Sequence, residues 1–600
     1  MLAKKLLSYY QNELSYLRKF GKRFACHFPK IARRLGMADG QTEDPHVERI
    51  IESFALLTAQ IQQRLDEEMP EVTEALLTVL APHFLRPWPS LCIVQMQPDP
   101  KSSGLTTACL LEAGSPLFSR TVPNHTCHFK TLYPVRLEPL TLDSAALHYD
   151  TADMQWRLTL RLQVWPGATL ESASLRFYLN GGSTAVNLLY ALLCEQVEHF
   201  SLTAGDSQFS LTASDIQPAG FARNEAILGC DARISPVYTL LQDYFLFPQK
   251  FHFLDFRLPP GFRAGSQQRL LLNFRFRHCA LIPQLEKIAA TLDKDFFRMH
   301  CTPAVNLFSL RAEPIVPYPQ TAEYPIVPDV RQAEAVAVWS VDSVQALHKE
   351  GDDLSTRSLS PLFGLNSAAG HSDPALFWQA IWRRTLTEKS EVCLPYIAFC
   401  DRSERPLTPE SDLVSLELTC YERDIPATMK NGDPQGDFEA ELPVAGVSIV
   451  ALTRPTASLA PPLKQAQRWQ LISHLSLNAM SIGGEQGVRV LKETLSLYNA
   501  NGNPVMKKLI DLILQVEVKP VTARLIANDP RSLSRGIEIT VIFHAAAAEE
   551  LEYFLFCRFL DRFLALYAPV NSFSRVITRT EPGEEAVRIW PLRSGRLSWI

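Results

Sequence analysis

DPHVERIIESFALLTAQIQQRLDEEMPEVTEALLTVLAPHFLRPWP, the sequence from Asp44 to Pro89, carries the strongest structural signal in this chain. Asp44 is a good N-cap because its carboxylate can accept the free amide hydrogens of a first helical turn. Pro45 fits the first helical position, where no amide donor is needed. Pro70 closes this helix and opens a shorter one, and later prolines end helix formation. The stretch therefore predicts a long helix followed by a short one.

Apolar residues in the long helix recur at steps of three and four, as they do on one face of a helix. The stripe consists of Val47, Ile50, Ile51, Phe54, Leu57, Ile61 and Leu65. It is wider than one neighbouring helix group needs, so we expect a helix within residues 1–38 to cover one side and a partner helix to cover the other. The predicted partner contacts are Val47, Ile50, Phe54, Leu57 and Ile61.

The same stretch resembles the N-terminal signature of the TssF family (also called VasA or ImpG), baseplate subunits of the bacterial type VI secretion system. Residues 9–36 resemble the family's opening helix. Three further segments match downstream: PAVNLF at 303–308, WQLISHLSLN at 469–478 and YAPVNSFSRV at 567–576. Because the matches follow in order over nearly the whole chain, the resemblance implies a structural subunit that works through contacts and is not an enzyme.

The resemblance also implies a set of partners. Family members associate with TssG, typically as two TssF chains around one TssG. TssK and TssE join them to form a wedge, and wedges surround the VgrG hub. The expected location is cytoplasmic, in a baseplate docked at the inner-membrane complex, and no cofactor or metal is expected.

Composition indicates an ordinary large globular protein. The chain has 600 residues, of which 46% are hydrophobic and 20% charged, and its net charge of −5 argues against nucleic-acid binding, which needs a strong basic field. Its twelve cysteines are scattered without a CxxC pair, which is typical of a reduced, cytosolic chain. We see neither a signal peptide nor an apolar run of about 18 residues, so direct membrane insertion is not expected.

After Pro89 the sequence changes to short β-rich segments, among them 91–97, 156–165, 174–179 and 269–279, and residues 281–297 read as a helix. This pattern predicts a multidomain α+β fold. We expect a helical N-terminal segment at 1–90, a first α+β domain at 91–313 and a proline-rich linker at 314–330. A second α+β domain with loop insertions should follow at 331–600. Residues 270–309 and 537–574 both read as a strand, a helix and a strap containing proline, asparagine and phenylalanine, so we expect the two domains to be related. Asn306 and Asn571 should anchor these straps by bonding nearby backbone groups.

Candidate catalytic and metal-ligating residues are few. His125, Cys127 and His128 lie close together, but their spacing matches no closed zinc site, and neighbouring residues on a strand point to opposite faces. The same argument applies to the His278-Cys279 and His300-Cys301 pairs. The glycine-rich segment 483–487 lacks the Lys-Ser/Thr of a phosphate-binding loop, and no nucleophile elbow or zinc-protease motif occurs. Two alternatives stay open: a hydrolytic enzyme, and a membrane-surface protein that uses the basic helix within 1–38.

Overall fold

The structure is a computed structural model of the chain. It describes residues 10–11, 13–14, 16–17, 27–28, 30, 45–66, 76–78, 81–120, 122, 125–151, 153–229, 236–279, 281–318, 321–350, 353–362, 376–386, 391–401, 405–409, 413–460, 471, 484–499, 502–524, 533–565, 568, 572–581 and 587–595. The chain divides into two compact units. The smaller unit comprises Met1–Thr78 and Pro462–Leu475, and the larger comprises Val79–Pro461 and Ser476–Ile600.

The smaller unit contains the long helix α3, which runs from Pro45 to Asp66. The prediction of a helix that begins at Pro45 and ends before Pro70 is confirmed. Two hydroxyl groups bond back to the helix itself: Ser53 donates to the Arg49 carbonyl (2.8 Å) and Thr58 to the Phe54 carbonyl (2.9 Å). These polar side chains are therefore accommodated within the helix without a tertiary partner.

The larger unit is organised around a closed six-stranded barrel. Its strands, in order around the barrel, are β1 (Leu91–Pro98), β17 (Cys301–Val305), β4 (His128–Thr131), β3 (Pro116–Ser119), β25 (Phe438–Glu439) and β26 (Val447–Ala451). β1 pairs antiparallel with β17 on one side and with β26 on the other. The barrel thus joins strands from both sides of the proline-rich segment at 314–330, and the predicted domain division there stays a prediction.

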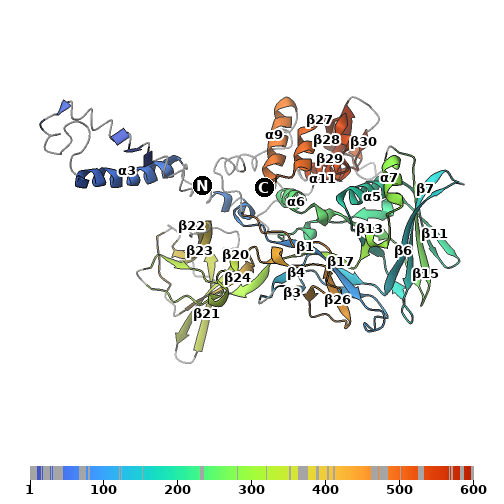
Figure 1. The fold of residues 1–600 in the computed structure, drawn as a ribbon, viewed down its shortest axis with the longest axis horizontal. Coiled ribbons are helices and arrows are strands. Elements are labelled where there is room, and N and C mark those ends of the chain that lie inside the picture. Colours follow the sequence, from blue (N-terminus) through green and yellow to red (C-terminus); the bar gives the residue numbers. More distant parts are fainter. Residues whose placement is uncertain are drawn as a thin grey trace. The chain divides into compact units, whose positions relative to one another are not determined.

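Two further sheets come from the first half of the chain. One has the order β11 (Ser207–Leu211), β10 (Val197–Ala204), β15 (Arg269–Phe276), β7 (Gln155–Val164), β6 (Leu140–Asp150). The other has the order β12 (Ile216–Pro218), β13 (Phe253–Arg257), β9 (Ser174–Leu179), β16 (Phe297–Met299). Their facing aromatic rings pack together, with Phe256 5.9 Å from Phe200 and 5.0 Å from Phe274. Helix α5 (Ser183–Glu195) lies beside them (Figure 1).

The helix predicted over 281–297 is shorter than expected. Helix α7 runs from Ile282 to Ala289, and a separate helical turn occupies Lys294–Phe296. The Asp293 side chain accepts the Asp295 amide hydrogen (2.9 Å), so it starts a new turn instead of continuing the helix. Sequence periodicity alone does not show this interruption.

A seven-stranded sheet surrounds the predicted linker. Its order is β18 (Phe308–Arg311), β24 (Leu413–Tyr421), β20 (Ala337–Glu350), β21 (Asp353–Pro361), β22 (Phe377–Leu386), β23 (Glu391–Cys400), β19 (Glu323–Pro325). The edge strand β19 lies inside the proline-rich segment and pairs with β23. Glu323 also forms a bidentate ion pair with Arg383 (2.6 and 2.7 Å). At least part of this segment is therefore integrated into a sheet.

The C-terminal part forms a sheet of β27 (Ile513–Arg524), β28 (Leu533–His544), β29 (Phe573–Glu581) and β30 (Arg588–Ile589), with β31 (Arg593–Ser594) beside β29. Figure 1 shows α9 (Gly484–Tyr498) and α11 (Tyr553–Ala565) next to this sheet, which α10 (Pro504–Asp511) also contacts. α11 also packs on α6 (Pro236–Leu246), where the rings of Phe559 and Tyr244 stack at 4.2 Å. The two halves of the sequence thus share buried aromatic contacts.

The two segments expected to be duplicates differ in strand order. β15 lies antiparallel between β10 and β7, and the strand after α7 in the strap, β17, belongs to the barrel. In contrast, β28 and β29 lie side by side and parallel in one sheet, joined through α11. The described strands therefore count against a relationship between the two halves, whereas the coarser prediction of a mixed, mostly β-sheet fold is confirmed.

Candidate partner-binding surface

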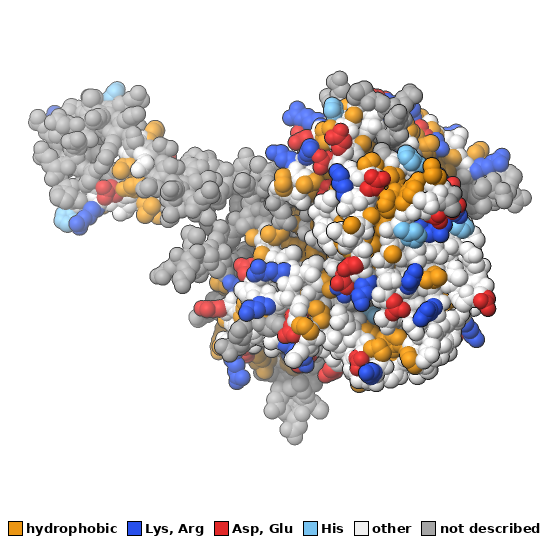
Figure 2. Space-filling model, turned by 45° about the vertical axis from the view of Figure 1, so that its right-hand side comes forward, with side chains coloured by type: hydrophobic (Ala, Val, Ile, Leu, Met, Phe, Trp, Pro, Cys, Tyr) orange, Lys and Arg blue, Asp and Glu red, His pale blue; other side chains and the backbone are white. Residues whose placement is uncertain are grey.

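Helix α3 presents an apolar face to solvent. Ile50, Phe54 and Leu57 are 68%, 58% and 58% exposed, and their spacing of four and three residues places them on one side of the helix. Figure 2 shows hydrophobic side chains gathered on the described part of the smaller unit. The side chains of Val47 and Ile61 lie outside the described residues. Of the five predicted partner contacts, the three that are described are available for binding.

Among the described side chains of the same helix, the buried ones are small. Ala55 and Ala59 are both fully buried. Their positions, four residues apart, are on the opposite side of the helix from Ile50 and Leu57. Because alanine side chains permit close approach of another segment, this is the side that packs within the chain. The periodicity of the large apolar residues in this helix predicts no role for these alanines.

Asn306 is fully buried at the end of β17 and forms several hydrogen bonds. Its side-chain amide donates to the His128 carbonyl (2.7 Å) and to the Glu422 carboxylate, and its oxygen accepts the Glu422 backbone amide (2.8 Å). Its own backbone amide donates to the Ser90 carbonyl (2.9 Å). These contacts fit the predicted anchor role, but they connect residues far apart in sequence instead of fixing a local turn. Asn571, the other predicted anchor, lies outside the described residues.

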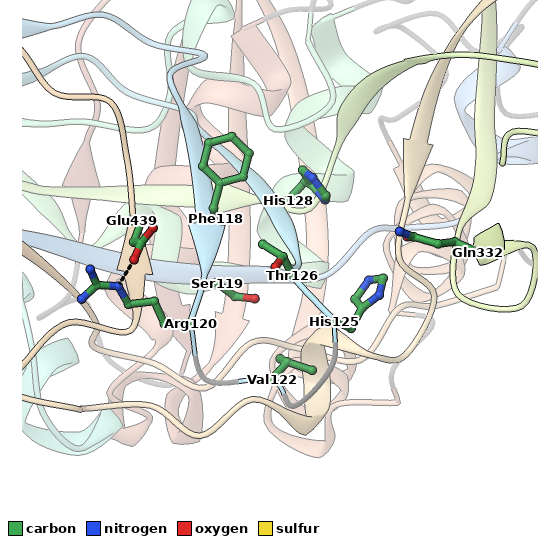
Figure 3. A pocket seen from close by; sticks show the side chains of 9 residues that line it. All are labelled: Phe118, Ser119, Arg120, Val122, His125, Thr126, His128, Gln332 and Glu439. Atoms are coloured by element: carbon green, nitrogen blue, oxygen red, sulfur yellow. Dashed lines mark hydrogen bonds and ion pairs between the residues drawn. The ribbon is translucent and has the colours of Figure 1, made fainter.

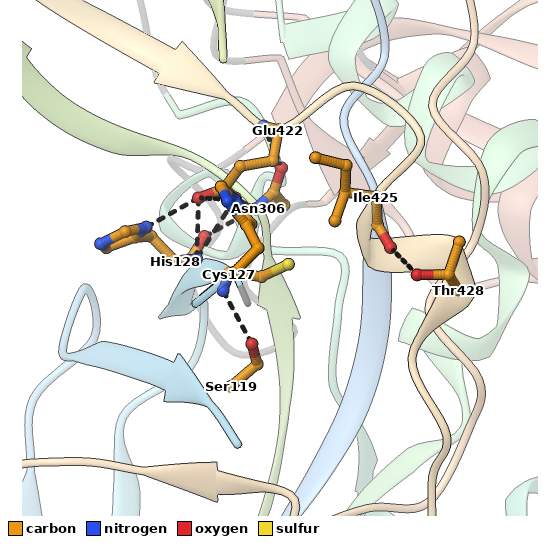
Figure 4. A network of polar contacts seen from close by, with 8 residues as sticks. Ser119, Cys127, His128, Asn306, Glu422, Ile425 and Thr428 are labelled. Carbon is orange, nitrogen blue, oxygen red and sulfur yellow. Dashed lines mark hydrogen bonds and ion pairs between the residues drawn. The ribbon is translucent and has the colours of Figure 1, made fainter. Parts of the chain in front are cut away.

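The carboxylate of Glu422 is the centre of this polar network (Figure 4). It is fully buried, one residue after β24, and accepts the His128 backbone amide (3.1 Å) and faces the His128 Nδ1 atom (2.7 Å). A buried carboxylate is costly unless it is paired and hydrogen bonded, and here both conditions are met. Glu422, Asn306 and His128 therefore join the seven-stranded sheet to the barrel. No local sequence pattern pointed to Glu422, since its partners come from distant segments.

An open hollow lies beside this network (Figure 3). The residues around it are Phe118, Ser119, Arg120, Val122, His125, Thr126, His128, Gln332 and Glu439. The pair of Glu422 and His128 is the kind of carboxylate–imidazole unit that a hydrolase uses to activate a nucleophile. However, the Ser119 hydroxyl accepts the Cys127 amide (2.7 Å), and no described hydroxyl or thiol is hydrogen bonded to His125 or His128. Phe118 and Phe308 pack on the His128 ring, with centroids at 5.5 and 4.6 Å.

The residues considered as metal ligands have structural surroundings. His300 is half-buried and has a left-handed backbone conformation (φ 58°), and its Nε2 atom accepts the Glu138 amide (3.0 Å). Burial lowers the pKa of His300 to about 4 and raises the pKa of Cys127 to about 12, so the first stays neutral and the second stays a thiol at neutral pH. Within the described residues, no group of three or more His, Cys, Asp or Glu side chains is placed to hold a metal ion.

Charge on the visible surface is mixed. Acidic and basic side chains are interspersed over the face shown in Figure 2. Such a surface lacks the concentrated positive field that phosphate backbones require. None of the helices that the structure describes combines the length and apolar character needed to span a bilayer.

Comparisons with known proteins agree on one family. The family model described as "Type VI secretion system, TssF" matches residues 2–597. Type VI secretion system component TssF1 of Pseudomonas aeruginosa is 30% identical over 622 aligned positions, which cover 98% of this chain and 99% of that protein.

Two solved structures share the fold. A chain from the type VI secretion TssK–TssF–TssG baseplate subcomplex matches with a TM-score of 0.73 and 25% identity, covering 92% of this chain and 99% of that chain. A chain from the type VI secretion baseplate complex matches with a TM-score of 0.59 and 23% identity, covering 99% and 100%, and shows the likeness of the fold.

Proposed function

Because the chain belongs to the TssF family of the type VI secretion system, we propose that it acts as a structural subunit of the baseplate wedge and binds TssG. The observation that carries this proposal is the match over 92% of the chain to a protein whose own structure is that of a TssK–TssF–TssG subcomplex. The family match extends over almost every residue, so the proposal concerns the whole chain and not one domain.

The exposed face of α3 is the surface we assign to TssG. Ile50, Phe54 and Leu57 expose more than half of their side chains. Water-exposed apolar side chains that lie together on one helix face favour burial against a second apolar helix. The adjoining positions Val47 and Ile61 complete this proposed contact face. We assign residues 1–90 as the partner-binding segment and the domains at 91–313 and 331–600, joined at 314–330, as docking domains for neighbouring subunits.

The remaining partners follow from the family. We propose that TssK and TssE, a second copy of this chain and the VgrG hub are its neighbours in the assembled wedge. The wedge would act as the platform on which the contractile tail is polymerised. The proposed location is the cytoplasm, in a baseplate docked at the inner-membrane complex.

We propose further that the chain has no catalytic role. Among the described residues, the carboxylate–imidazole pair of Glu422 and His128 lacks a bonded nucleophile and is packed by two phenylalanine rings. The hydrogen bonds of this pair connect the seven-stranded sheet to the barrel. A structural role accounts for each described contact of Glu422 and His128.

Co-expression with the cognate TssG, followed by native mass measurement of the purified complex, tests the proposed function. We expect a stable complex whose mass corresponds to two copies of this chain and one TssG. TssG alone and this chain alone, purified in the same buffer, are the controls. Recovery of the two proteins as separate species after co-expression would refute the proposal.

A further inference from the structure

A second surface, on the larger unit, carries unneutralised positive charge. Arg558 and Arg562 lie one turn apart on α11, so their side chains emerge from the same side of the helix. Both are partly exposed. Each guanidinium lies over aromatic rings: Arg558 is 5.4 Å from the Phe554 ring centroid, and Arg562 is 5.6 Å from that of Phe221.

The nearby carboxylates form their hydrogen bonds with other arginines. Asp561 lies between Arg558 and Arg562 in the sequence and is almost fully buried, and its Oδ2 atom accepts two hydrogen bonds from Arg593 (2.5 and 2.8 Å). Its Oδ1 atom has no hydrogen-bond partner among the described residues. Glu195 on α5 forms a bidentate ion pair with Arg588. The local cluster therefore has four guanidinium groups and two carboxylates.

Arg558 and Arg562 are the two groups left over. Neither forms an ion pair or a hydrogen bond with a described residue, and the Nε atom of each is buried without a partner. Burial lowers the pKa of Arg562 to about 10, and the positive charges of Arg593 and Arg558 add to this lowering. Burial also acts to lower the pKa of Arg558, but the acidic groups around it, Asp561 and Glu195 among them, raise that pKa overall, so the excess positive charge lies at Arg562. Partly buried charge without a counterion is costly, so a fold does not retain it for stability alone.

We propose that Arg558 and Arg562 form a docking site for a pair of carboxylates on an acidic segment of a neighbouring baseplate protein. The planar guanidinium group binds a carboxylate through two parallel hydrogen bonds, and two such groups one helical turn apart match two acidic side chains on one strand or helix. The aromatic rings beneath them hold the arginine side chains in place and exclude water on one side. Only the identification of the partner as a baseplate chain rests on the proposed function.

The net charge of the chain allows binding at this arginine pair to be distinguished from general electrostatic attraction of an acidic peptide. The whole chain carries a net charge of −5, so an acidic peptide is repelled overall and binds only where local charge is reversed. A nucleic acid would need a far more extended basic surface than one arginine pair provides.

The test uses the full-length chain and a fluorescein-labelled oligoglutamate peptide of about ten residues, with binding measured by fluorescence anisotropy at low and at physiological salt. We expect Arg558→Gln with Arg562→Gln to weaken binding roughly tenfold. The matched control, Arg263→Gln with Arg489→Gln, removes the same charge from side chains that are 74% and 83% exposed, and should change binding by less than about twofold. The melting temperature of the Arg558/Arg562 variant should equal or exceed that of the unmodified chain.

Two results would overturn the proposal. The first is equal binding by the two double variants, which would show a diffuse charge effect. The second is no binding by the unmodified chain even at low salt. If the Arg558/Arg562 double variant does not fold, the single variants decide, and unchanged binding in both contradicts the proposal. TssG takes no part in this assay, so its outcome is independent of the proposed role in the baseplate.

Discussion

Replacing Ile50 and Leu57 by glutamine should separate partner binding from folding. In the isolated chain these side chains are 68% and 58% exposed, so they contribute little to the stability of their own unit. If α3 meets a helix of TssG through this face, the same side chains become buried in the complex. The double substitution Ile50→Gln with Leu57→Gln should therefore weaken the complex and leave the free chain almost unchanged.

The magnitude follows from the exposed area. Burying about 100 Å² of apolar surface per side chain at about 25 cal/mol/Å² gives roughly 2.5 kcal/mol for each residue. Ordering of the interface reduces this gain, so we expect roughly 1 to 3 kcal/mol per residue, or about 5- to 150-fold in Kd. For the free chain, substitution at solvent-exposed positions should change the free energy of unfolding by no more than about 0.5 kcal/mol.

The assay measures recovery of the TssG complex and thermal melting of the isolated chain side by side. The matched control, Leu110→Gln with Val330→Gln, changes two apolar side chains of the larger unit that are 55% and 67% exposed. This control should leave both the complex and the melting curve unchanged. A large loss of melting temperature in Ile50→Gln with Leu57→Gln, with normal binding by the surviving folded fraction, would assign this face to the chain's own core. That result would refute the partner-helix interpretation.

Three further predictions concern stability. Asn306→Ala should lower the free energy of unfolding by about 2 to 3 kcal/mol, because it removes hydrogen bonds to the buried Glu422. Asn306→Asp should lower it by more, because it places a second carboxylate against Glu422. Denaturant unfolding measures both changes, and equal stability of the two variants and the unmodified chain would contradict the anchor role. Burial lowers the pKa of His252 and His300 to about 4. Below about pH 6.5 the unfolded chain therefore binds protons at these histidines that the folded chain does not bind. Each histidine should remove about 1.4 kcal/mol of stability per pH unit as the pH falls from 6.5 to 4. His252→Gln should make this pH dependence shallower in unfolding titrations, and an unchanged slope would show that His252 does not contribute. The complex with TssG should melt several degrees above the isolated chain, which should be partly aggregated without its partner, whereas identical melting curves would argue against binding through an exposed apolar face.

Local sequence signals were sufficient for many of the elements of this fold, although not for the end of α7 or for β19. Pro45, the step of three and four between apolar residues, and Pro70 set the limits of α3, since helix capping and periodicity depend only on nearby residues. Short β-rich segments likewise predicted β1, β7, β9 and β15 close to their observed limits. The whole-chain resemblance identified the family because its motifs are long and follow in order.

The candidate surfaces depended partly on the sequence and partly on the fold. Periodicity placed Ile50, Phe54 and Leu57 on one face of α3, but which side of the helix faces solvent depends on what packs against Ala55 and Ala59. The sequence does not show that Arg558 and Arg562 of α11 lack an ion-pair partner, because Asp561 is close to both in the chain and could pair with either arginine. Only the tertiary structure shows that Asp561 binds Arg593 instead.

The sequence by itself determined the family and most of the helices and strands that it predicted, because these follow from residues close together in the chain or from long ordered motifs. The tertiary structure decided how the strands are grouped: β1 pairs with β26 across the proline-rich segment, and Glu422 meets Asn306 and His128 between a sheet and the barrel. Such pairings depend on the closure of long loops and on the burial of polar groups against partners from distant segments. Local periodicity does not encode either of them. For that reason the strand orders count against the predicted relationship between the two halves, although most of the predicted elements are present.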